Sequence, residues 1–213
     1  MNAAPAPRVT LPSREFGGYI FDLDGTLVDS MPTHYRAWRL ALQQYGAPPS
    51  VFQWDEFNAH GGMAACDIVK DLNATYGLSM PPETVAAAKR AHYAHFVDTE
   101  NLPIIAETVG LVRRLRERGI PYAIGTGSAL PGALATLRAA GIDDLFSLII
   151  TPDDVAAGKP APDIFLLAAE RMGVPAHDCV VFEDAAPGLR AAHAAGMTAV
   201  QVKPLGISKK CPH

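Results

Sequence analysis

Cysteine is scarce in this sequence, and long apolar runs are absent. The three cysteines of the chain are scattered, and none forms a Cys-x-x-Cys pair. An odd, scattered set argues against a disulfide framework and indicates reduced thiols. No run approaches the roughly 18 apolar residues that a membrane-spanning helix needs, and the N-terminal stretch MNAAPAPRVTLPSREF lacks the apolar segment of a signal peptide. We therefore expect a cytoplasmic protein.

The sequence also lacks an excess of positive charge. Its 18 lysines and arginines stand against 22 aspartates and glutamates, which gives a net charge of -4 with neutral histidines. Binding to nucleic acid or to anionic lipid depends on a basic field that this balance does not supply. We expect neither a nucleic acid nor a membrane as a partner, and the sequence carries no signal for the oligomeric state.

Short apolar runs alternate with helical patterns along most of the chain. Hydrophobic residues make up 49% of the 213 residues, which is enough for one sizeable core or for a core with a small second domain. The runs are apolar on both faces, as strands covered by helices on both sides should be. The predicted strands are GYIF (18–21), YAIG (122–125), LIIT (148–151), CVVF (179–182) and TAVQV (198–202).

Glycines mark the ends of the predicted helices, because glycine readily takes the left-handed conformation that closes a helix. These glycines are Gly46, Gly119, Gly141, Gly173 and Gly196. Between residues 120 and 202 strands and helices alternate strictly. This order predicts an α/β fold with a doubly wound parallel sheet.

The first two predicted strands are separated by a long stretch of helical pattern, which proline pairs at 48–49 and 81–82 divide into several helices. An insertion at this point of an α/β sheet would lie over the carboxyl ends of the strands. We therefore interpret this stretch as a small helical cap on a catalytic core. The expected boundaries are 31–98 for the cap, 16–30 and 99–207 for the core, and 1–15 and 208–213 for flexible tails.

Polar side chains suited to phosphate chemistry follow four of the predicted strands. Ligands of parallel sheets bind beyond the carboxyl ends of the strands, so these side chains should meet at one rim. They are Asp22 and Asp24 after the first strand, Thr126 after the second, Lys159 in the loop after the third, and Glu183 and Asp184 after the fourth.

Such a set predicts a site for Mg²⁺ and a phosphate group. Clustered carboxylates repel one another unless a cation neutralises them, and a few hard oxygen ligands suit Mg²⁺, which shares its site with substrate phosphate. A lysine, a strand-end hydroxyl and backbone amides complete a cradle for phosphate oxygens. Positioning and charge neutralisation of this kind account for most of the catalysis in phosphoryl transfer.

The chain resembles phosphatases of the haloacid dehalogenase superfamily in four motifs that occur in the same order. These are DLDGT at 22–26, TGS at 126–128, KPAPD at 159–163 and FEDAAPG at 182–188. Within that superfamily it is similar to the β-phosphoglucomutase-like branch, and the stretches 32–42 and 159–174 are similar to bacterial fructose-1-phosphate/6-phosphogluconate phosphatases. The resemblance implies a Rossmann-like core, and Mg²⁺-dependent hydrolysis of a small sugar phosphate monoester through an aspartyl-phosphate.

The resemblance also implies roles for individual residues. Asp22 would be the nucleophile that attacks phosphorus. Asp24 would act as general acid toward the leaving alcohol and then as general base for the hydrolytic water. The phosphoryl oxygens would be held by Thr126, Gly127 and Lys159, and Lys159 would also orient Asp22.

For the metal, the resemblance implies ligation of Mg²⁺ by the Asp22 carboxylate, the Asp24 backbone carbonyl and Asp184. Glu183 would either ligate directly or stand behind the ligands.

Positions outside the core motifs allow more than one interpretation. His34 lies where mutases of this branch carry a hinge histidine that contacts the general acid, and it could equally be a half-exposed histidine in the first cap helix. His60, beside Gly61-Gly62, is expected in a cap loop that faces the site, where it is a candidate for substrate binding and contact with substrate is left open. Asp29-Ser30, followed by Pro32, is interpreted as a helix cap and not as part of the chemistry.

Two rival functions remain open at this point. A phosphomutase needs cap cations for the second phosphate of a bisphosphate, and the corresponding positions here fall at Ala64 and Ala91, with Lys89 or Arg90 as possible substitutes. A phosphosugar-binding module without catalysis would also share the fold. Dehalogenases of this superfamily lack the second aspartate, and no cap lysine can be matched to that of phosphonatases. We expect a sugar phosphatase because the four core motifs are intact.

Overall fold

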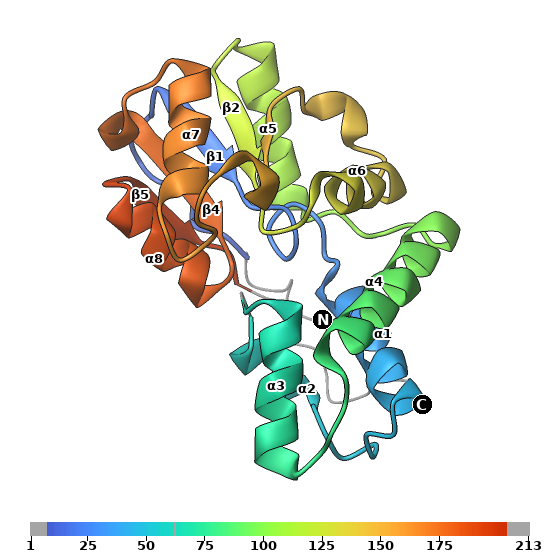
Figure 1. Ribbon diagram of the computed structural model, residues 1–213. Coiled ribbons are helices and arrows are strands. Elements are labelled where there is room, and N and C mark those ends of the chain that lie inside the picture. The colour runs from blue at the N-terminus through green and yellow to red at the C-terminus, as the bar shows by residue number, and fades with distance from the viewer. Residues whose placement is uncertain (1–7, 62, 204–213) are drawn as a thin grey trace, which may run out of the picture.

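A parallel sheet of five strands forms the centre of the protein (Figure 1). The computed structural model describes residues 8–61 and 63–203. The strand order is β3-β2-β1-β4-β5. The strands are β1 (Gly18–Phe21), β2 (Tyr122–Gly125), β3 (Ile149–Ile150), β4 (Cys179–Glu183) and β5 (Thr198–Gln201). The predicted doubly wound α/β fold is thereby confirmed, although the third and fifth strands are shorter than expected.

Alternate residues of the central strands enter two separate cores. Phe21 and Ile124 belong to one, whereas their neighbours Ile20 and Ala123 belong to the other. Helices α5 (Ala106–Glu117) and α6 (Leu130–Ala139) supply the first core, and α7 (Asp163–Met172) and α8 (Ala186–Ala194) supply the second. Burial on both faces is why β1 and β4 read as continuous apolar runs.

All five glycines predicted to close helices have positive φ. The values are +85° at Gly46, +64° at Gly119, +65° at Gly141, +69° at Gly173 and +72° at Gly196. Residues with a Cβ rarely adopt this conformation, which is why glycine marks these ends.

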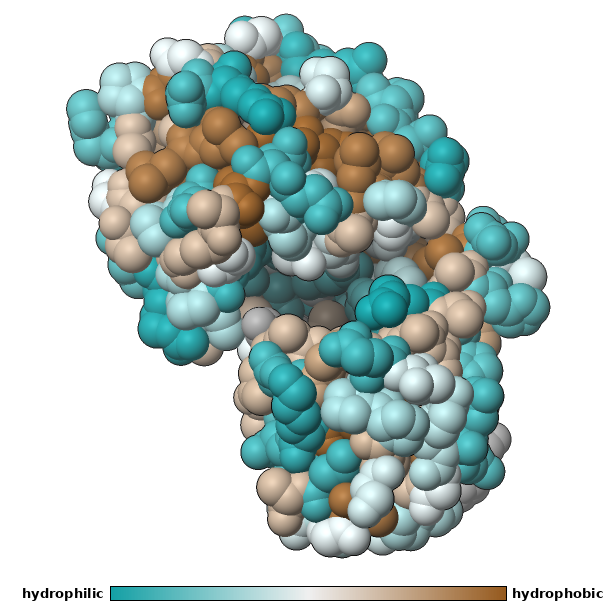
Figure 2. Space-filling view, in the orientation of Figure 1, coloured by the Kyte–Doolittle hydropathy of each residue, from teal (hydrophilic) through white to brown (hydrophobic). Residues whose placement is uncertain are grey.

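Four helices form a group of their own between β1 and α5, here called the cap. They are α1 (Met31–Gln44), α2 (Trp54–Ala59), α3 (Ala65–Tyr76) and α4 (Pro82–Thr99). The cap has a separate apolar core that includes Trp38, Phe52 and Leu72. In Figure 1 the cap lies below the carboxyl ends of the strands, and Figure 2 shows a hollow between the two parts.

The segment before β1 is less loose than the sequence suggests. Val9 is buried in the core, and the Arg8 backbone N–H donates to Glu107 while its carbonyl accepts from the Lys203 N–H. These two residues of the predicted tail are therefore in contact with the core. Residues 1–7 and 208–213 of the predicted tails lie outside the described residues. Within the described part of the chain, no helix combines the length and the apolar character needed to cross a membrane.

Candidate active site

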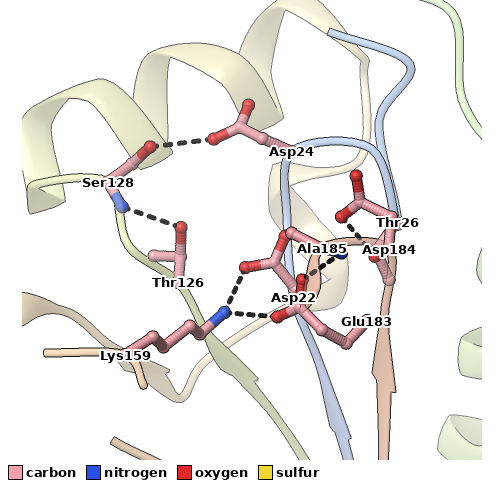
Figure 3. A network of polar contacts seen from close by, with 9 residues as sticks. All are labelled: Asp22, Asp24, Thr26, Thr126, Ser128, Lys159, Glu183, Asp184 and Ala185. Carbon is pink, nitrogen blue, oxygen red and sulfur yellow. Dashed lines mark hydrogen bonds and ion pairs between the residues drawn. The ribbon is translucent and has the colours of Figure 1, made fainter. Parts of the chain in front are cut away.

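The carboxyl ends of two neighbouring strands, β1 and β4, bring the acidic residues together. Asp22 directly follows β1, Glu183 is the last residue of β4, and Asp184 comes next. The parallel register sets Phe21 beside both Ile124 and Phe182, so residues that follow these positions meet at one edge. Figure 3 shows their side chains converging there.

Lys159 links two of these carboxylates. Its Nζ lies 2.6 Å from Asp22 Oδ1 and 2.7 Å from Glu183 Oε2. Burial alone would lower the pKa of Lys159, but the negative charges of Asp22 and Glu183 outweigh burial and hold that pKa well above its ordinary value. Lys159 is therefore a fixed cation, and it orients one oxygen of Asp22.

One lysine does not neutralise the whole acidic cluster. Asp22, Glu183 and Asp184 offer carboxylate oxygens that all lie within 4.8 Å of one another. Burial and then repulsion from Glu183 raise the pKa of Asp22 to about 7. Burial and then repulsion from Asp22 raise the pKa of Asp184. A cation would relieve this repulsion, and the all-oxygen donor set fits Mg²⁺.

Glu183 differs from the other two carboxylates in its partners. Its Oε2 accepts from Lys159, and its Oε1 accepts from the Ala185 backbone N–H at 3.0 Å. With both oxygens engaged, Glu183 is placed to support the site from behind. Asp184 Oδ1 has one weak partner, the Thr26 hydroxyl at 3.4 Å, and remains available to a metal.

Two glycines leave the space that these carboxylates occupy. Gly25 has φ +88°, and a Cβ there would collide with the Asp184 carboxylate. A Cβ on Gly188, in the first turn of α8, would collide with the Glu183 side chain. Steric contact with these carboxylates therefore explains why glycine occupies these two positions in the motifs at 22–26 and 182–188.

We expect Gly188→Ala to destabilise the fold by about 1–3 kcal/mol, because the methyl group overpacks a buried carboxylate. Gly132 provides a matched control, since it also follows a proline in the first turn of a helix and a Cβ there would meet nothing within 4 Å. Gly132→Ala should stabilise by about 0.4–1 kcal/mol. Thermal unfolding of the two variants checks both signs, and equal melting temperatures would contradict the steric account.

Asp24 lies in a second polar pocket beside the first. In Figure 3 its carboxylate is turned away from Asp22 and toward Ser128. The Ser128 hydroxyl donates to Asp24 Oδ2 at 2.8 Å, and the Ser30 hydroxyl donates to Asp24 Oδ1 at 2.6 Å. Ser30 occupies the N-cap position of α1, as predicted, but its side chain makes no capping hydrogen bond to the helix. The local sequence does not reveal whether the Ser30 hydroxyl binds the start of the helix or a carboxylate, because serine suits both roles.

A histidine and a lysine from the cap extend this pocket. His34 Nε2 lies 3.2 Å from Asp24 Oδ1, and His34 Nδ1 lies 2.8 Å from Lys89 Nζ. A charged lysine can only donate, so Nδ1 accepts and the proton of a neutral imidazole faces Asp24. Of the two interpretations of His34, the structure shows the one that contacts Asp24.

The pKa values in this pocket follow from burial and charge. Burial, and then the positive charge of Lys89, lower the pKa of His34. Burial also lowers the pKa of Lys89, to about 8. Burial would raise the pKa of Asp24, but His34 and the Ser30 and Ser128 hydroxyls outweigh it and hold that pKa well below its usual range. Asp24 is a carboxylate in this conformation.

The other expected substrate contacts differ in how accessible they are. Thr126 is buried, and its hydroxyl accepts from the Ser128 backbone N–H at 3.0 Å. Gly127 is exposed at the rim, where a Cβ would meet nothing within 4 Å. The described residues thus leave the 127 backbone open to a ligand.

His60 has both ring nitrogens engaged by neighbouring groups of the cap. Its Nδ1 lies 2.8 Å from the Glu56 carbonyl oxygen, and its Nε2 lies 2.8 Å from Asp71 Oδ2. Both ring nitrogens are satisfied inside the cap, so we leave His60 out of the site proposed below. Its predicted role in substrate binding has no support from these contacts.

Sequence reasoning missed three contributors to the Asp24 pocket: Ser30, Ser128 and Lys89. Ser128 stands in the motif at 126–128, so its position after a strand could have identified it. By sequence, Lys89 is a candidate phosphate ligand and not a partner of His34. Its contact with His34 joins residues 55 positions apart and leaves no local pattern.

Comparison with known proteins finds the following similarities. The sequence profile of the haloacid dehalogenase-like hydrolases matches residues 16–196. Fructose-1-phosphate phosphatase YqaB of Escherichia coli (strain K12) is 39% identical over 190 residues, which cover 88% of this chain and 97% of that protein. Hexitol phosphatase A of the same organism is 33% identical over 186 residues, which cover 87% of this chain and 82% of that protein.

Among solved structures, β-phosphoglucomutase (pgmB) from Clostridium difficile superimposes with a TM-score of 0.70 at 26% identity. The match covers 86% of this chain and 83% of that one.

Proposed function

This chain belongs to the haloacid dehalogenase-like hydrolase family, and we propose that it hydrolyses small sugar phosphate monoesters with Mg²⁺ through an aspartyl-phosphate on Asp22. The observation that carries the proposal is the position of Asp22, held at 2.6 Å by Lys159 within a cluster of three carboxylates. Two of its relatives are named fructose-1-phosphate phosphatase and hexitol phosphatase, which supports the substrate class.

In the first step an Asp22 carboxylate oxygen attacks phosphorus, and the bond from phosphorus to the substrate oxygen breaks. The attacking form is the carboxylate, and Lys159 orients it by binding Oδ1. Burial and repulsion from Glu183 raise the pKa of Asp22 to about 7, which supports a neutralising cation beside the carboxylate. Lys159, Thr126 and the Gly127 backbone are the groups that we propose for the phosphoryl oxygens.

Asp24 would serve the leaving group. Its carboxylate points away from Asp22 (Figure 3), so that one aspartate attacks while the other reaches the departing oxygen. A phosphate dianion beside Asp24 opposes the contacts that lower its pKa, which makes the protonated form accessible. Asp24 gives this proton to the leaving oxygen and then takes one from water, which attacks phosphorus and releases phosphate and Asp22.

The Asp22 and Asp184 carboxylates and the Asp24 backbone carbonyl would hold Mg²⁺, with Glu183 behind them. When bound, Mg²⁺ supplies positive charge that stabilises the negative charge of the transferring group. The described residues fit this role, because Asp22 and Asp184 repel each other without a cation.

The cap supports hydrolysis over phosphate exchange between sugars. A mutase needs free cations in the cap for a second phosphate, but most basic side chains there have partners. Arg36 binds Glu100, Arg39 binds the carbonyls of Pro49 and Val51, Lys70 binds Asp67, and Lys89 binds His34. The likeness to β-phosphoglucomutase keeps the mutase as the alternative, with exposed Arg90 as the cation that it would need.

A steady-state panel of phosphate esters tests this proposal. We expect fructose 1-phosphate and 6-phosphogluconate to exceed sugar bisphosphates and nucleotides by roughly 10-fold or more in kcat/KM, since unmatched polar groups are costly to bury. The panel is run with and without a trace of sugar bisphosphate as primer. Interconversion of glucose 1-phosphate and glucose 6-phosphate that outpaces phosphate release would favour the mutase. No phosphate release from any ester would favour a binding module.

A further inference from the structure

A tyrosine of the cap crosses the seam between the cap and the core. Tyr93 lies on α4 with 8% of its surface exposed, and it packs into the apolar core of the α/β domain together with Leu137. Its hydroxyl lies 2.8 Å from the hydroxyl of Thr136 on α6. Thr136 is 1% exposed, so this bond is shielded from water. The cap thus has a fixed polar attachment to the core.

The ring of Tyr93 also lies flat against His34. The two ring centroids are 3.8 Å apart, and the planes differ by 4°. His34 uses both of its edges, with Nε2 toward Asp24 and Nδ1 toward Lys89. Contact over a full ring face therefore restricts the tilt of the imidazole, while the edge contacts restrict its rotation within the plane.

Filling space would not by itself require this residue. A phenylalanine would supply the same ring without a hydroxyl that must be hydrogen-bonded when buried. An aliphatic side chain would fill the seam without a flat face for the imidazole. Tyr93 provides both the flat ring face for His34 and a hydroxyl that binds Thr136. This hydroxyl is also 3.5 Å from Asp24 Oδ1.

We infer that Tyr93 is a positioning residue for the general acid, stacked on His34 and anchored to the core through Thr136, so that His34 holds the Asp24 carboxylate in one orientation. This inference rests on the proposed function, because Asp24 is taken to protonate the leaving oxygen. Loss of Tyr93 frees the imidazole to tilt, and Asp24 then loses the fixed orientation that its contact with His34 provides.

The dependence of kcat/KM on the acidity of the leaving group tests this role of Tyr93. Phenyl phosphate and p-nitrophenyl phosphate are similar in shape, but phenol is a weaker acid than p-nitrophenol and needs a proton more. The value of kcat/KM covers the reaction through phosphoryl transfer to Asp22. A fault in the general acid therefore lowers kcat/KM more for phenyl phosphate. A general loosening of the fold would lower kcat/KM for both esters alike.

The experiment compares Tyr93→Phe and Tyr93→Leu with wild type on the two esters. For phenyl phosphate we expect kcat/KM to fall roughly 3- to 10-fold in Tyr93→Phe, which loses the anchor but keeps the stack. The fall should be roughly 30- to 100-fold in Tyr93→Leu, which loses both. For p-nitrophenyl phosphate the losses should be several times smaller.

Tyr122→Phe is the matched control. The Tyr122 hydroxyl donates to the Leu145 carbonyl at 2.6 Å, at the opposite end of the strands from the site. Its removal should leave the ratio of the two kcat/KM values within about twofold of wild type, as expected for a bond remote from the reacting atoms. A change in that ratio as large as in Tyr93→Phe would overturn the proposal.

A shift of the ratio in either Tyr93 variant supports the proposal, and a ratio within twofold of wild type in both overturns it. If Tyr93→Leu does not fold, the ratio of the two kcat/KM values in Tyr93→Phe alone tests the proposal. Failure of the proposed function itself is recognised separately, because wild type would then release no phosphate from either ester.

Discussion

Replacement of Asp22 by asparagine is expected to lower kcat by about 10⁴-fold or more, in the range that loss of a nucleophile costs other enzymes. Asparagine keeps the shape of the side chain but removes the charged oxygen that attacks phosphorus. The other groups proposed for phosphate, among them Lys159, are unchanged. KM or direct binding of the sugar phosphate should therefore change little compared with kcat. Single-turnover rates together with binding of substrate to the variant measure the two effects separately.

Thermal stability gives Asp22→Asn a second readout whose sign can be derived. The folded-state pKa of Asp22 is raised to about 7 from an ordinary value of 3.8. The folded state therefore binds this proton more tightly, and metal-free wild type loses stability as pH rises from about 4 toward 7. Asparagine does not titrate. Without metal, the variant should melt no lower than wild type at neutral pH.

Asp144→Asn is the control for charge removal. Its carboxylate is 73% exposed and pairs with Arg116 on the surface. Activity should stay within about twofold of wild type, since exposed ion pairs contribute at most about 1 kcal/mol. An Asp22→Asn enzyme that keeps a tenth of the wild-type rate would rule out the aspartyl-phosphate route.

Removal of divalent metal is expected to lower activity by about 10³-fold or more, because several kcal/mol of charge stabilisation are lost. Treatment with EDTA should abolish turnover, and added Mg²⁺ should restore it. Ca²⁺ should inhibit, because its bonds are about 0.3–0.5 Å longer and its coordination number is higher than those of Mg²⁺. Phosphate release measured across a metal series tests the expectation.

A binding measurement separates metal ligation from catalysis. Mg²⁺ should raise the melting temperature of wild type, since it relieves repulsion between Asp22 and Asp184 in the folded state. Asp184→Asn should largely lose this increase, while Asp144→Asn should keep it. Full turnover in metal-free buffer would contradict the proposed metal site.

The sequence by itself was sufficient for the family and for the α/β core. Strands such as 18–21 and 179–182 are apolar on both faces, and this pattern can be recognised from the residues of the strand itself. The polar residues that follow each strand could also be placed, because parallel strands present their carboxyl ends at one edge. That rule is why the sequence predicts Asp22, Lys159 and Asp184 at one site.

Only the tertiary structure decided what surrounds Asp24. Ser30 has the sequence context of a helix cap, yet its hydroxyl binds Asp24. Lys89 could be a phosphate ligand by sequence, yet it binds His34. Tyr93 fits an ordinary buried helix position, yet it joins His34 to Thr136. These side chains come from separate elements of the cap and core. Their partners depend on how the two parts pack together, and a local pattern contains no information about that packing.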